Sequence, residues 1–416
     1  MSDTPSAVAP VAPVRKAALL FILITVTLDI LALGMIIPVL PHLFEQFLSG
    51  DTAEAARYYG FAAMLWASMQ FLFSPVLGTL SDRFGRRPVV LLSNLGLGLD
   101  YILMALAPTL LWLFIGRAIS GITAASITTA GAYIADVTPA EKRAAAFGMI
   151  GAAFGIGFVI GPALGGVLGD VDPRLPFWVA AALSLANFCY GWFVLPESLP
   201  PEKRTPRFVW RTANPFGSLV WLRDHGRLAG LAAVHFLSSL AHYVLPSTFV
   251  LYTAHRFHWG PKEVGWTLGL VGIASAIVQA GLVRRVVPKI GERRALMLGL
   301  AFGALGFAMY GAAPNGYWML AGIPVMALWG FAGPATQAMM TSQLEAHEQG
   351  RLQGGLSSLM GVAGMIGPGL FTQVFAWFIV VRNGWTLPGA PMFIAAVLLL
   401  AAMVVGWRAS RSLAAT

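Results

Sequence analysis

The sequence contains little charge. Of its 416 residues only 11% are Asp, Glu, Lys or Arg, whereas 57% are hydrophobic. A soluble domain carries about 25% charged residues. We therefore expect most of the chain to lie in a lipid bilayer, where each helical span takes about 20 apolar residues.

Cysteine and enzyme motifs are also scarce. The single cysteine, Cys189, lies in an apolar segment, which excludes an intrachain disulfide and makes a cysteine-based metal site implausible. The sequence contains no HExxH, Walker A, CxxC or Ser/His/Asp arrangement. We expect no cofactor, no metal ion and no enzymatic activity.

Apolar segments follow one another along almost the whole chain. The first follows Arg15 and Lys16 and is too long for a signal-peptide core, so it is predicted to be an uncleaved span. The predicted fold class is an all-α polytopic membrane protein with twelve transmembrane helices in two pseudo-symmetric six-helix bundles. The helices are expected at about 17–39, 58–80, 88–108, 110–134, 145–169, 176–195, 228–252, 264–285, 293–313, 316–340, 352–378 and 388–407.

The net charge of +9 is better explained by membrane topology than by nucleic-acid binding, because the basic residues lie in short loops. With twelve spans, 21 of the 27 Lys and Arg residues fall on the side of the termini and 5 on the other side; Arg117 falls within a span. By the positive-inside rule both termini are predicted to be cytoplasmic, in a bacterial-type inner membrane.

The longest polar break separates two halves of six spans. It runs from Pro196 to Arg227 and is basic and rich in proline. The predicted parts are a disordered N-terminus, a first bundle, a cytoplasmic linker, a second bundle and a tail, at 1–16, 17–195, 196–227, 228–407 and 408–416. Two such halves related by an axis along the membrane normal are a transporter arrangement.

A short charged hairpin joins spans two and three, and the second half repeats it. Asp82 stands between Gly78 and Pro88, and its charge cannot enter lipid cheaply. The glycines permit close backbone approach, and Pro88 suits a first helical turn. In the second half the stretch 284–294 keeps the bases but has Pro288 at the place of Asp82.

Ionisable residues inside spans are functional candidates. Asp29 and Asp100 are either carboxylates that bond local backbone or protonatable or cation-recognising groups that face a central cavity. Arg117 is either a structural partner of a buried acid or of helix carbonyls, or part of a coupling switch, in which its charge holds one of these acids ionised until a proton weakens the pair.

Neutral polar residues in the spans leave two interpretations open. His235 and His242 lie seven residues apart, so they share one helix face; hydrogen-bonded helix contacts are favoured over a titrating pair. Gln70, Gln279 and Gln337 either hydrogen-bond a substrate or join helices.

The fifth span carries closely spaced small residues. They allow close helix packing, either as a simple seam or as a joint between the halves that shears during transport. The residues concerned are Gly157, Gly161, Pro162, Gly165 and Gly166.

These motifs resemble the major facilitator superfamily, and within it the twelve-span drug/proton antiporters, above all the tetracycline resistance efflux transporters. The stretch 78–87 is similar to the superfamily's loop 2–3 motif, Arg117 to its span-four arginine, and 157–166 to the antiporter motif. Segments typical of the tetracycline group are Leu99-Asp100-Tyr101, Ile134-Ala135-Asp136, Gln337 and 349–354.

The resemblance implies roles for these residues. Asp29, Asp100 and Arg117, with Gln70, Gln279 and Gln337, would line a cavity and couple protons to drug movement. Asp82 would form a latch with Arg86, Asp136 and the N-terminus of span eleven. The whole predicted cytoplasmic gate comprises Gly78, Asp82, Arg83, Gly85, Arg86, Arg87, Asp136 and Arg143.

The chain departs from the tetracycline group in its second half. That group carries a His and an Asp important for coupling in spans eight and nine; by spacing, Ser275 and Gly303 stand there. The predicted function is export of an amphipathic organic compound by proton antiport and alternating access, by a functional monomer, with a tetracycline-like drug as one candidate. The alternatives are proton-coupled uptake of a small metabolite and a non-transporting receptor on the same fold.

Overall fold

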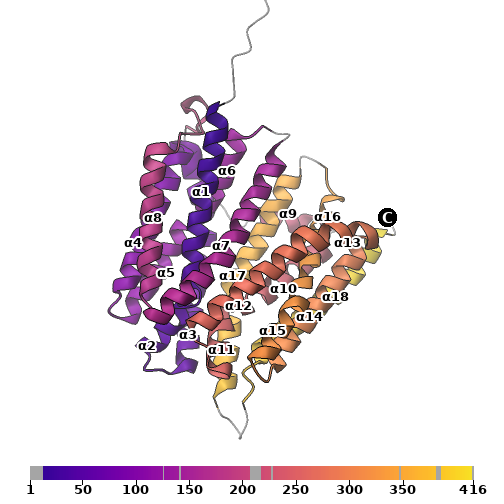
Figure 1. The fold of residues 1–416 in the computed structure, drawn as a ribbon. Coiled ribbons are helices and arrows are strands. Elements are labelled where there is room, and N and C mark those ends of the chain that lie inside the picture. The colour runs from indigo at the N-terminus through magenta and orange to yellow at the C-terminus, as the bar shows by residue number, and fades with distance from the viewer. Residues whose placement is uncertain are drawn as a thin grey trace, which may run out of the picture.

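The fold is helical throughout the described part of the chain (Figure 1). The computed structural model describes residues 13–124, 126–139, 142–206, 217–225, 228–345, 348–380 and 386–414. Residues 1–12 of the predicted disordered N-terminus lie outside this part, and the first helix begins at Pro13.

The first half and the linker contain nine α-helices and a short 3₁₀ helix within the described residues. Their bounds are α1 (Pro13–Ile36), α2 (Leu40–Phe47), α3 (Thr52–Phe84), α4 (Arg86–Leu106), α5 (Leu110–Thr123), α6 (Ser126–Val137), α7 (Arg143–Val171), α8 (Leu175–Val194), η2 (Pro201–Lys203) and α9 (Gly217–Asp224).

The second half contains α-helices interrupted by one π and one 3₁₀ segment within the described residues. Their bounds are α10 (Ala229–His242), α11 (Val244–Phe257), α12 (Pro261–Ile277), the π segment η4 (Val278–Val283), α13 (Arg284–Ile290), α14 (Glu292–Ala312), α15 (Gly316–Ala327), the 3₁₀ segment η5 (Leu328–Phe331), α16 (Ala332–Thr341), α17 (Gln349–Ile379) and α18 (Ala390–Ala414).

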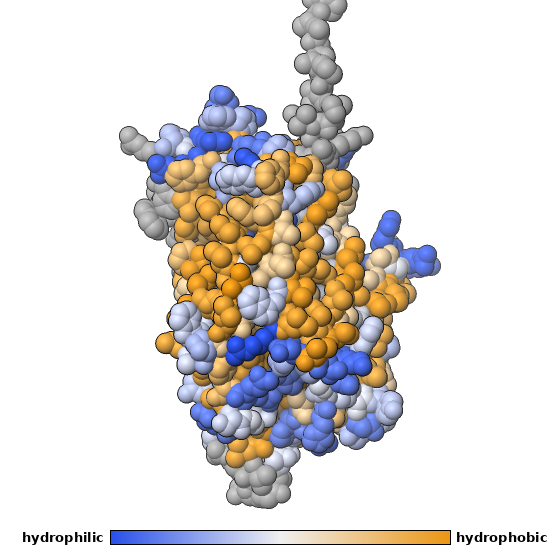
Figure 2. Space-filling model, turned by 60° about the vertical axis from the view of Figure 1, so that its left-hand side comes forward, coloured by the Kyte–Doolittle hydropathy of each residue, from blue (hydrophilic) through white to orange (hydrophobic). Residues whose placement is uncertain are grey.

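The predicted architecture of twelve spans is confirmed. In the described residues eleven helical segments are long and apolar enough to cross a membrane. The shorter apolar helix α5, followed by α6, occupies the place of the remaining span. Figure 2 shows a broad hydrophobic belt on one face of the molecule, with hydrophilic side chains gathered above and below it.

Several spans predicted as continuous helices are interrupted instead. The first ends at Ile36 and resumes as α2, close to Pro38 and Pro41. The seventh breaks at Tyr243, three residues before Pro246. Proline provides no N–H for the carbonyl four residues earlier, so it weakens the helix at these places. Hydropathy alone does not record such breaks.

Capping residues set several helix ends beyond the predicted ones. Asp51 caps α3, because its carboxylate accepts from the N–H groups of Ala53 and Glu54 at 2.9 Å. At the other end α3 continues to Phe84, and Gly85 alone, with φ +105°, joins it to α4. The predicted span 58–80 is therefore too short at both ends.

The two halves repeat the same backbone turns. Gly85 and Gly291 have φ values of +105° and +81° and ψ values of 158° and 155°. Gly85 and Gly291 are 206 positions apart in the sequence. Ala107 and Ala313, each of which directly follows a helix of 21 residues, are also 206 positions apart. This register confirms that Pro288 stands at the place of Asp82.

The halves approach each other at the end opposite the termini. There Gly166 on α7 packs on Gly265 of α12, and Gly60 on α3 packs on Thr372 of α17. Toward the other end the contacts loosen, since Cβ atoms added at Gly155 and Gly281 would meet nothing within 4 Å. In Figure 1 α13 and α18 lean away from α4 and α8 toward that end.

The glycines of the fifth span serve two interfaces. Within the first half a Cβ at Gly161 would lie 2.9 Å from the Cα of Gly34 on α1. Across the interface between the halves, a Cβ at Gly166 would lie 2.4 Å from the carbonyl oxygen of Pro261 and 2.9 Å from the Cα of Gly265. Residues of one motif thus pack both within the first half and across the interface between the halves; that the second contact shears during transport stays a prediction.

We expect Gly166→Val to destabilise this arrangement, because backbone atoms of α12 occupy the space that the new side chain needs. Overpacking typically costs about 1–3 kcal/mol. The measurement is the thermal unfolding midpoint of the purified protein. Gly155→Val on the same helix is the matched control, as its Cβ meets nothing within 4 Å; equal midpoints for the two variants would contradict the proposed contact.

Candidate functional site

A buried charge pair lies inside the first half. Asp100 on α4 is 1% exposed and Arg117 on α5 is 8% exposed. Neither Asp100 oxygen has a partner in good hydrogen-bond geometry among the described residues, but the guanidinium of Arg117 and the hydroxyl of Ser120 lie close enough to stabilise its negative charge. The carboxylate lies against α5, since a Cβ at Gly116 would come within 2.9 Å of Asp100 Oδ1.

Arg117 is held by an aromatic ring rather than by a close ion pair. Its guanidinium carbon lies 5.1 Å from the centroid of the Trp66 ring on α3, a cation–π contact. No ion pair within 4.0 Å joins Arg117 to an acid of the described residues. The buried carboxylate of Asp100 is therefore stabilised either by the positive charge of Arg117 or by binding a proton.

Asp29 occupies a separate position on α1. Its Oδ1 accepts a hydrogen bond of 3.0 Å from Asn187 Nδ2 on α8, and the same amide donates to the carbonyl of Thr25 at 3.1 Å. The ring of Tyr101, 1% exposed, lies within electrostatic range of both acids and of Arg117. Of the two acids, Asp100 rather than Asp29 is the one that stabilises the positive charge of Arg117.

The charged hairpin forms an ion-pair relay at the end that carries the termini. Arg86 pairs through Nη1 with Asp82 at 2.5 Å and through Nε with Asp136 on α6 at 3.1 Å. The neighbouring bases lie differently: Arg83 stacks on Phe84, while Arg87 donates to the carbonyl of Trp192. The side chain of Arg143 lies outside the described residues.

Glu197 completes this cluster and was missed by the sequence analysis. Its carboxylate accepts from the backbone N–H groups of Arg86 at 2.8 Å and Arg87 at 3.3 Å, at the start of α4. Its second partner is Arg204 at 3.8 Å. A carboxylate at a helix N-terminus is stabilised by the helix dipole. The available signal was an acid directly after the last apolar residue of span six, at the head of a basic linker.

Only one of the two hairpin glycines provides a close approach. A Cβ at Gly85 would lie 2.2 Å from Glu197 Oε2, whereas a Cβ at Gly78 would meet nothing within 4 Å. The expectation that both glycines permit close backbone contact is therefore wrong for Gly78, which lies within α3 rather than at the turn.

The expected contact between Asp82 and span eleven is absent from this conformation. Among the described residues no hydrogen bond or ion pair joins Asp82 to the first turn of α17. That end of α17 instead meets the linker helix, where His225 Nε2 lies 3.5 Å from Glu348. The two halves diverge at this end of the molecule, so Asp82 and the N-terminus of α17 stay apart.

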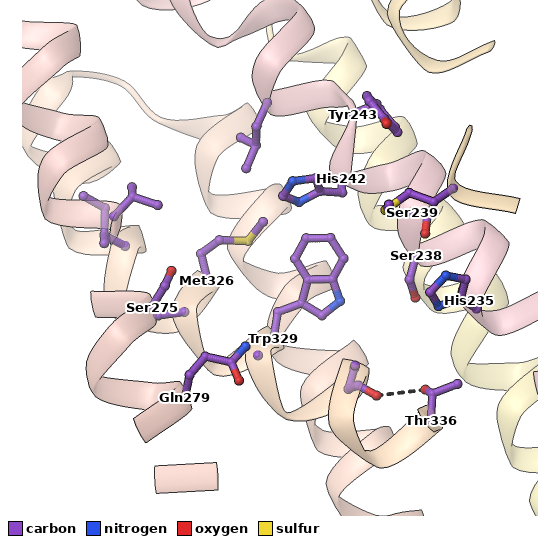
Figure 3. Close-up of a pocket in the computed structure, with 18 of the residues that line it drawn as sticks. His235, Ser238, Ser239, His242, Tyr243, Ser275, Gln279, Met326, Trp329 and Thr336 are labelled. Atoms are coloured by element: carbon purple, nitrogen blue, oxygen red, sulfur yellow. Dashed lines mark hydrogen bonds between the residues drawn. The ribbon is translucent and has the colours of Figure 1, made fainter. Parts of the chain in front are cut away.

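A cavity of about 370 Å³ lies in the second half (Figure 3), within the range of about 300–1,000 Å³ typical of small-molecule sites. Its polar wall is formed by His235, Ser238, Ser239, His242, Tyr243, Ser275, Gln279, Trp329 and Thr336. Its apolar wall includes Leu245, Val271, Ile323, Met326 and Met360.

Three helix interruptions meet at this cavity. Gln279 lies in the π segment η4, Trp329 in the 3₁₀ segment η5, and Tyr243 at the break between α10 and α11. Departures from α-helical geometry often mark functional sites, and transporter binding sites are typically built from discontinuous helices.

The structure thus separates the predicted cavity residues. Gln279 and Ser275 line the cavity, as do His235 and His242, for which helix contacts were favoured. Gln70 is half-buried on α3 and Gln337 is exposed on α16; neither lines it. The polar side chain of Asn187, the partner of Asp29, was not singled out from the sequence, although an amide inside an apolar span is a recognisable signal.

Comparisons with known proteins agree with this architecture. A family model described as Major Facilitator Superfamily matches residues 22–228 and 231–412. The chain is 39% identical to the Tetracycline resistance protein, class C, of Escherichia coli, over 91% of this chain and 94% of that protein. It is 36% identical to the class B protein of Escherichia coli, over 87% of this chain and 90% of that protein.

Solved transporters share the fold at low identity. A bacterial homolog of the human lysosomal transporter Spinster, in an inward-facing and unoccupied conformation, superposes with a TM-score of 0.75 and 16% identity, covering 96% of this chain and 97% of that one. The twelve spans, the repeated hairpin and the matched family model lead to one conclusion: this chain belongs to the major facilitator superfamily, alongside its tetracycline resistance efflux proteins.

Proposed function

We propose that the protein exports an amphipathic organic compound in exchange for protons by alternating access. The observation that carries this proposal is Asp100, a buried carboxylate without an ion-pair contact among the described residues, whose negative charge is stabilised by the nearby Arg117 and by the Ser120 hydroxyl. Such a group is well suited to exchange its pairing with Arg117 for a proton. The relatives named as tetracycline resistance proteins support drug export as the direction.

The proposed orientation places both termini and the charged hairpin in the cytoplasm of a bacterial-type inner membrane. The open end of the molecule is then cytoplasmic, and the close contacts of Gly166 with Gly265 and of Gly60 with Thr372 seal the outer end. A substrate would enter from the cytoplasm in this conformation. One chain supplies both halves, so we propose a functional monomer.

Each proposed residue has a distinct task. Asp29 and Asp100 carry protons, with Arg117 as the counter-charge of Asp100, and Gln279 contacts substrate in the cavity. The cluster of Asp82, Gly85, Arg86, Asp136 and Glu197 holds the cytoplasmic hairpin together; when the halves close there, Asp82 would reach the first turn of α17.

The experiment that tests the function has two stages. A growth-protection screen in an efflux-deficient host identifies a transported compound, with tetracyclines in the panel. That compound is then added to proteoliposomes with an imposed pH gradient. Proton movement opposite to the compound supports antiport; movement in the same direction would favour proton-coupled uptake, and no movement of any compound would favour a receptor.

We expect Asp100→Asn and Asp29→Asn to abolish pH-driven transport while leaving the protein folded, because an amide cannot carry the exchanged proton. The measurement is substrate flux in proteoliposomes with and without a pH gradient. Asp170→Asn is the matched control, since Asp170 is exposed at the end of α7. Full pH-driven flux in both variants would rule out the assignment.

We expect Glu197→Gln to slow turnover with little change in equilibrium substrate binding. The variant loses the negative charge at the start of α4 and the ion pair with Arg204; charge-assisted hydrogen bonds contribute about 1.5–3 kcal/mol each. Stopped-flow transport and equilibrium binding separate the two effects. Glu202→Gln, in the exposed part of the same linker, should change neither; a binding loss at position 197 with normal turnover would argue against a gating role.

A further inference from the structure

Structurally equivalent positions in the two halves carry side chains of different chemical type. The 206-residue register that relates Gly85 to Gly291 also relates Leu110, the start of α5, to Gly316, the start of α15. In the same register Asp100 corresponds to Gly306 and Arg117 to Ile323. Ile323 lines the cavity. The first half therefore holds a charge pair where the second half holds a cavity.

The cavity wall contains no acid and no Lys or Arg among the described residues that line it. Its titratable groups are two histidines and two tyrosines: His235, His242, Tyr243 and Tyr310. From position 228 onward the sequence has no aspartate and only four glutamates, Glu263, Glu292, Glu345 and Glu348. Glu263 and Glu292 lie in the first turn of a helix, and Glu345 and Glu348 lie between α16 and α17. A cation in this cavity would be desolvated without a local counter-charge, which is strongly unfavourable.

The wall instead offers hydrogen-bond donors next to a flat aromatic surface. The ring centroids of His242 and Trp329 are 5.8 Å apart. The ring of Phe307, on α14, has its centroid 5.5 Å from that of Trp329. Ring N–H groups, the Gln279 amide and the serine hydroxyls suit oxygen acceptors on a ligand. Figure 3 shows Gln279 and His242 on either side of Trp329.

The packing around Trp329 keeps an acid out of the neighbouring position. A Cβ at Gly303 would lie 2.8 Å from Cγ of Trp329 and 2.7 Å from Cδ1 of Leu399. Trp329 therefore occupies the space that an aspartate at 303 would need. The absence of an acid at position 303 and the presence of the Trp329 ring in the cavity wall therefore have the same structural cause.

We propose that this cavity binds an oxygen-rich aromatic compound that carries no positive charge, and that this compound class is the substrate of the exporter. The second clause rests on the proposed transport function. Recognition comes from N–H and O–H donors of His242, Gln279 and Ser275 to ligand oxygens, with the ligand ring against Trp329.

Two dyes with the same three-ring xanthene core provide a matched test. Fluorescein carries oxygen substituents and a carboxylate, whereas rhodamine 6G carries alkylamino groups, an ester and a positive charge. Binding of each dye to the purified full-length protein in nanodiscs is measured at equilibrium, with EDTA present and empty nanodiscs subtracted. We expect fluorescein to bind at least about tenfold more tightly than rhodamine 6G, because the N–H and O–H donors of the wall can hydrogen-bond its oxygens, including the anionic ones, whereas no carboxylate of the wall can pair with the cation.

Substitutions locate the binding site. We expect His242→Ala and Gln279→Ala each to weaken fluorescein binding about three- to tenfold, the loss typical of one hydrogen bond. Gln343→Ala, at an exposed position outside the cavity, should leave it unchanged. Tighter binding of rhodamine 6G, or fluorescein binding that is absent or insensitive to both cavity variants, would overturn the proposal. Since no gradient is applied, this outcome is independent of the antiport test.

Discussion

The arrangement depends on one buried interaction, the electrostatic attraction between the carboxylate of Asp100 and the guanidinium of Arg117, which form no close ion pair. A bilayer-embedded bundle gains little by burying charge, so this pair is costly unless the two groups compensate each other. Arg117 and the Ser120 hydroxyl stabilise the negative charge of Asp100, so protonation of Asp100 would weaken its attraction to Arg117. Tyr101 interacts electrostatically with both acids and with Arg117.

Small residues decide how the halves can move around that pair. Gly166 and Gly265 bring α7 and α12 into backbone contact, and Gly60 admits Thr372 of α17. Such contacts have little side-chain interlocking, so they can separate without repacking a core. At the other end the hairpin is held within its own half by Arg86, which pairs with Asp82 and Asp136, and by Glu197.

Much of the fold could be predicted from sequence, because twelve apolar runs, loop charges and a repeated hairpin are local signals. Asp100 and Arg117 were also recognisable as candidates, since ionisable residues are rare inside spans, but the sequence left open whether Arg117 meets Asp29 or Asp100. The partners were not predictable: Asn187, Trp66 and Glu197 are chosen by helix rotation and by a loop folding back over 110 residues. Of the predicted cavity residues only Gln279 lines the cavity of the second half, because this cavity arises where the helix breaks near Tyr243, Gln279 and Trp329 meet in space.

The most direct test of the account is the protonation of Asp100 itself. Infrared difference spectra of the purified protein between alkaline and acidic pH report the C=O stretch of each carboxyl group that gains a proton. We expect a C=O band from a buried carboxylic acid, present in the unsubstituted protein and in Asp170→Asn but missing in Asp100→Asn. The same band remaining in Asp100→Asn would contradict the account.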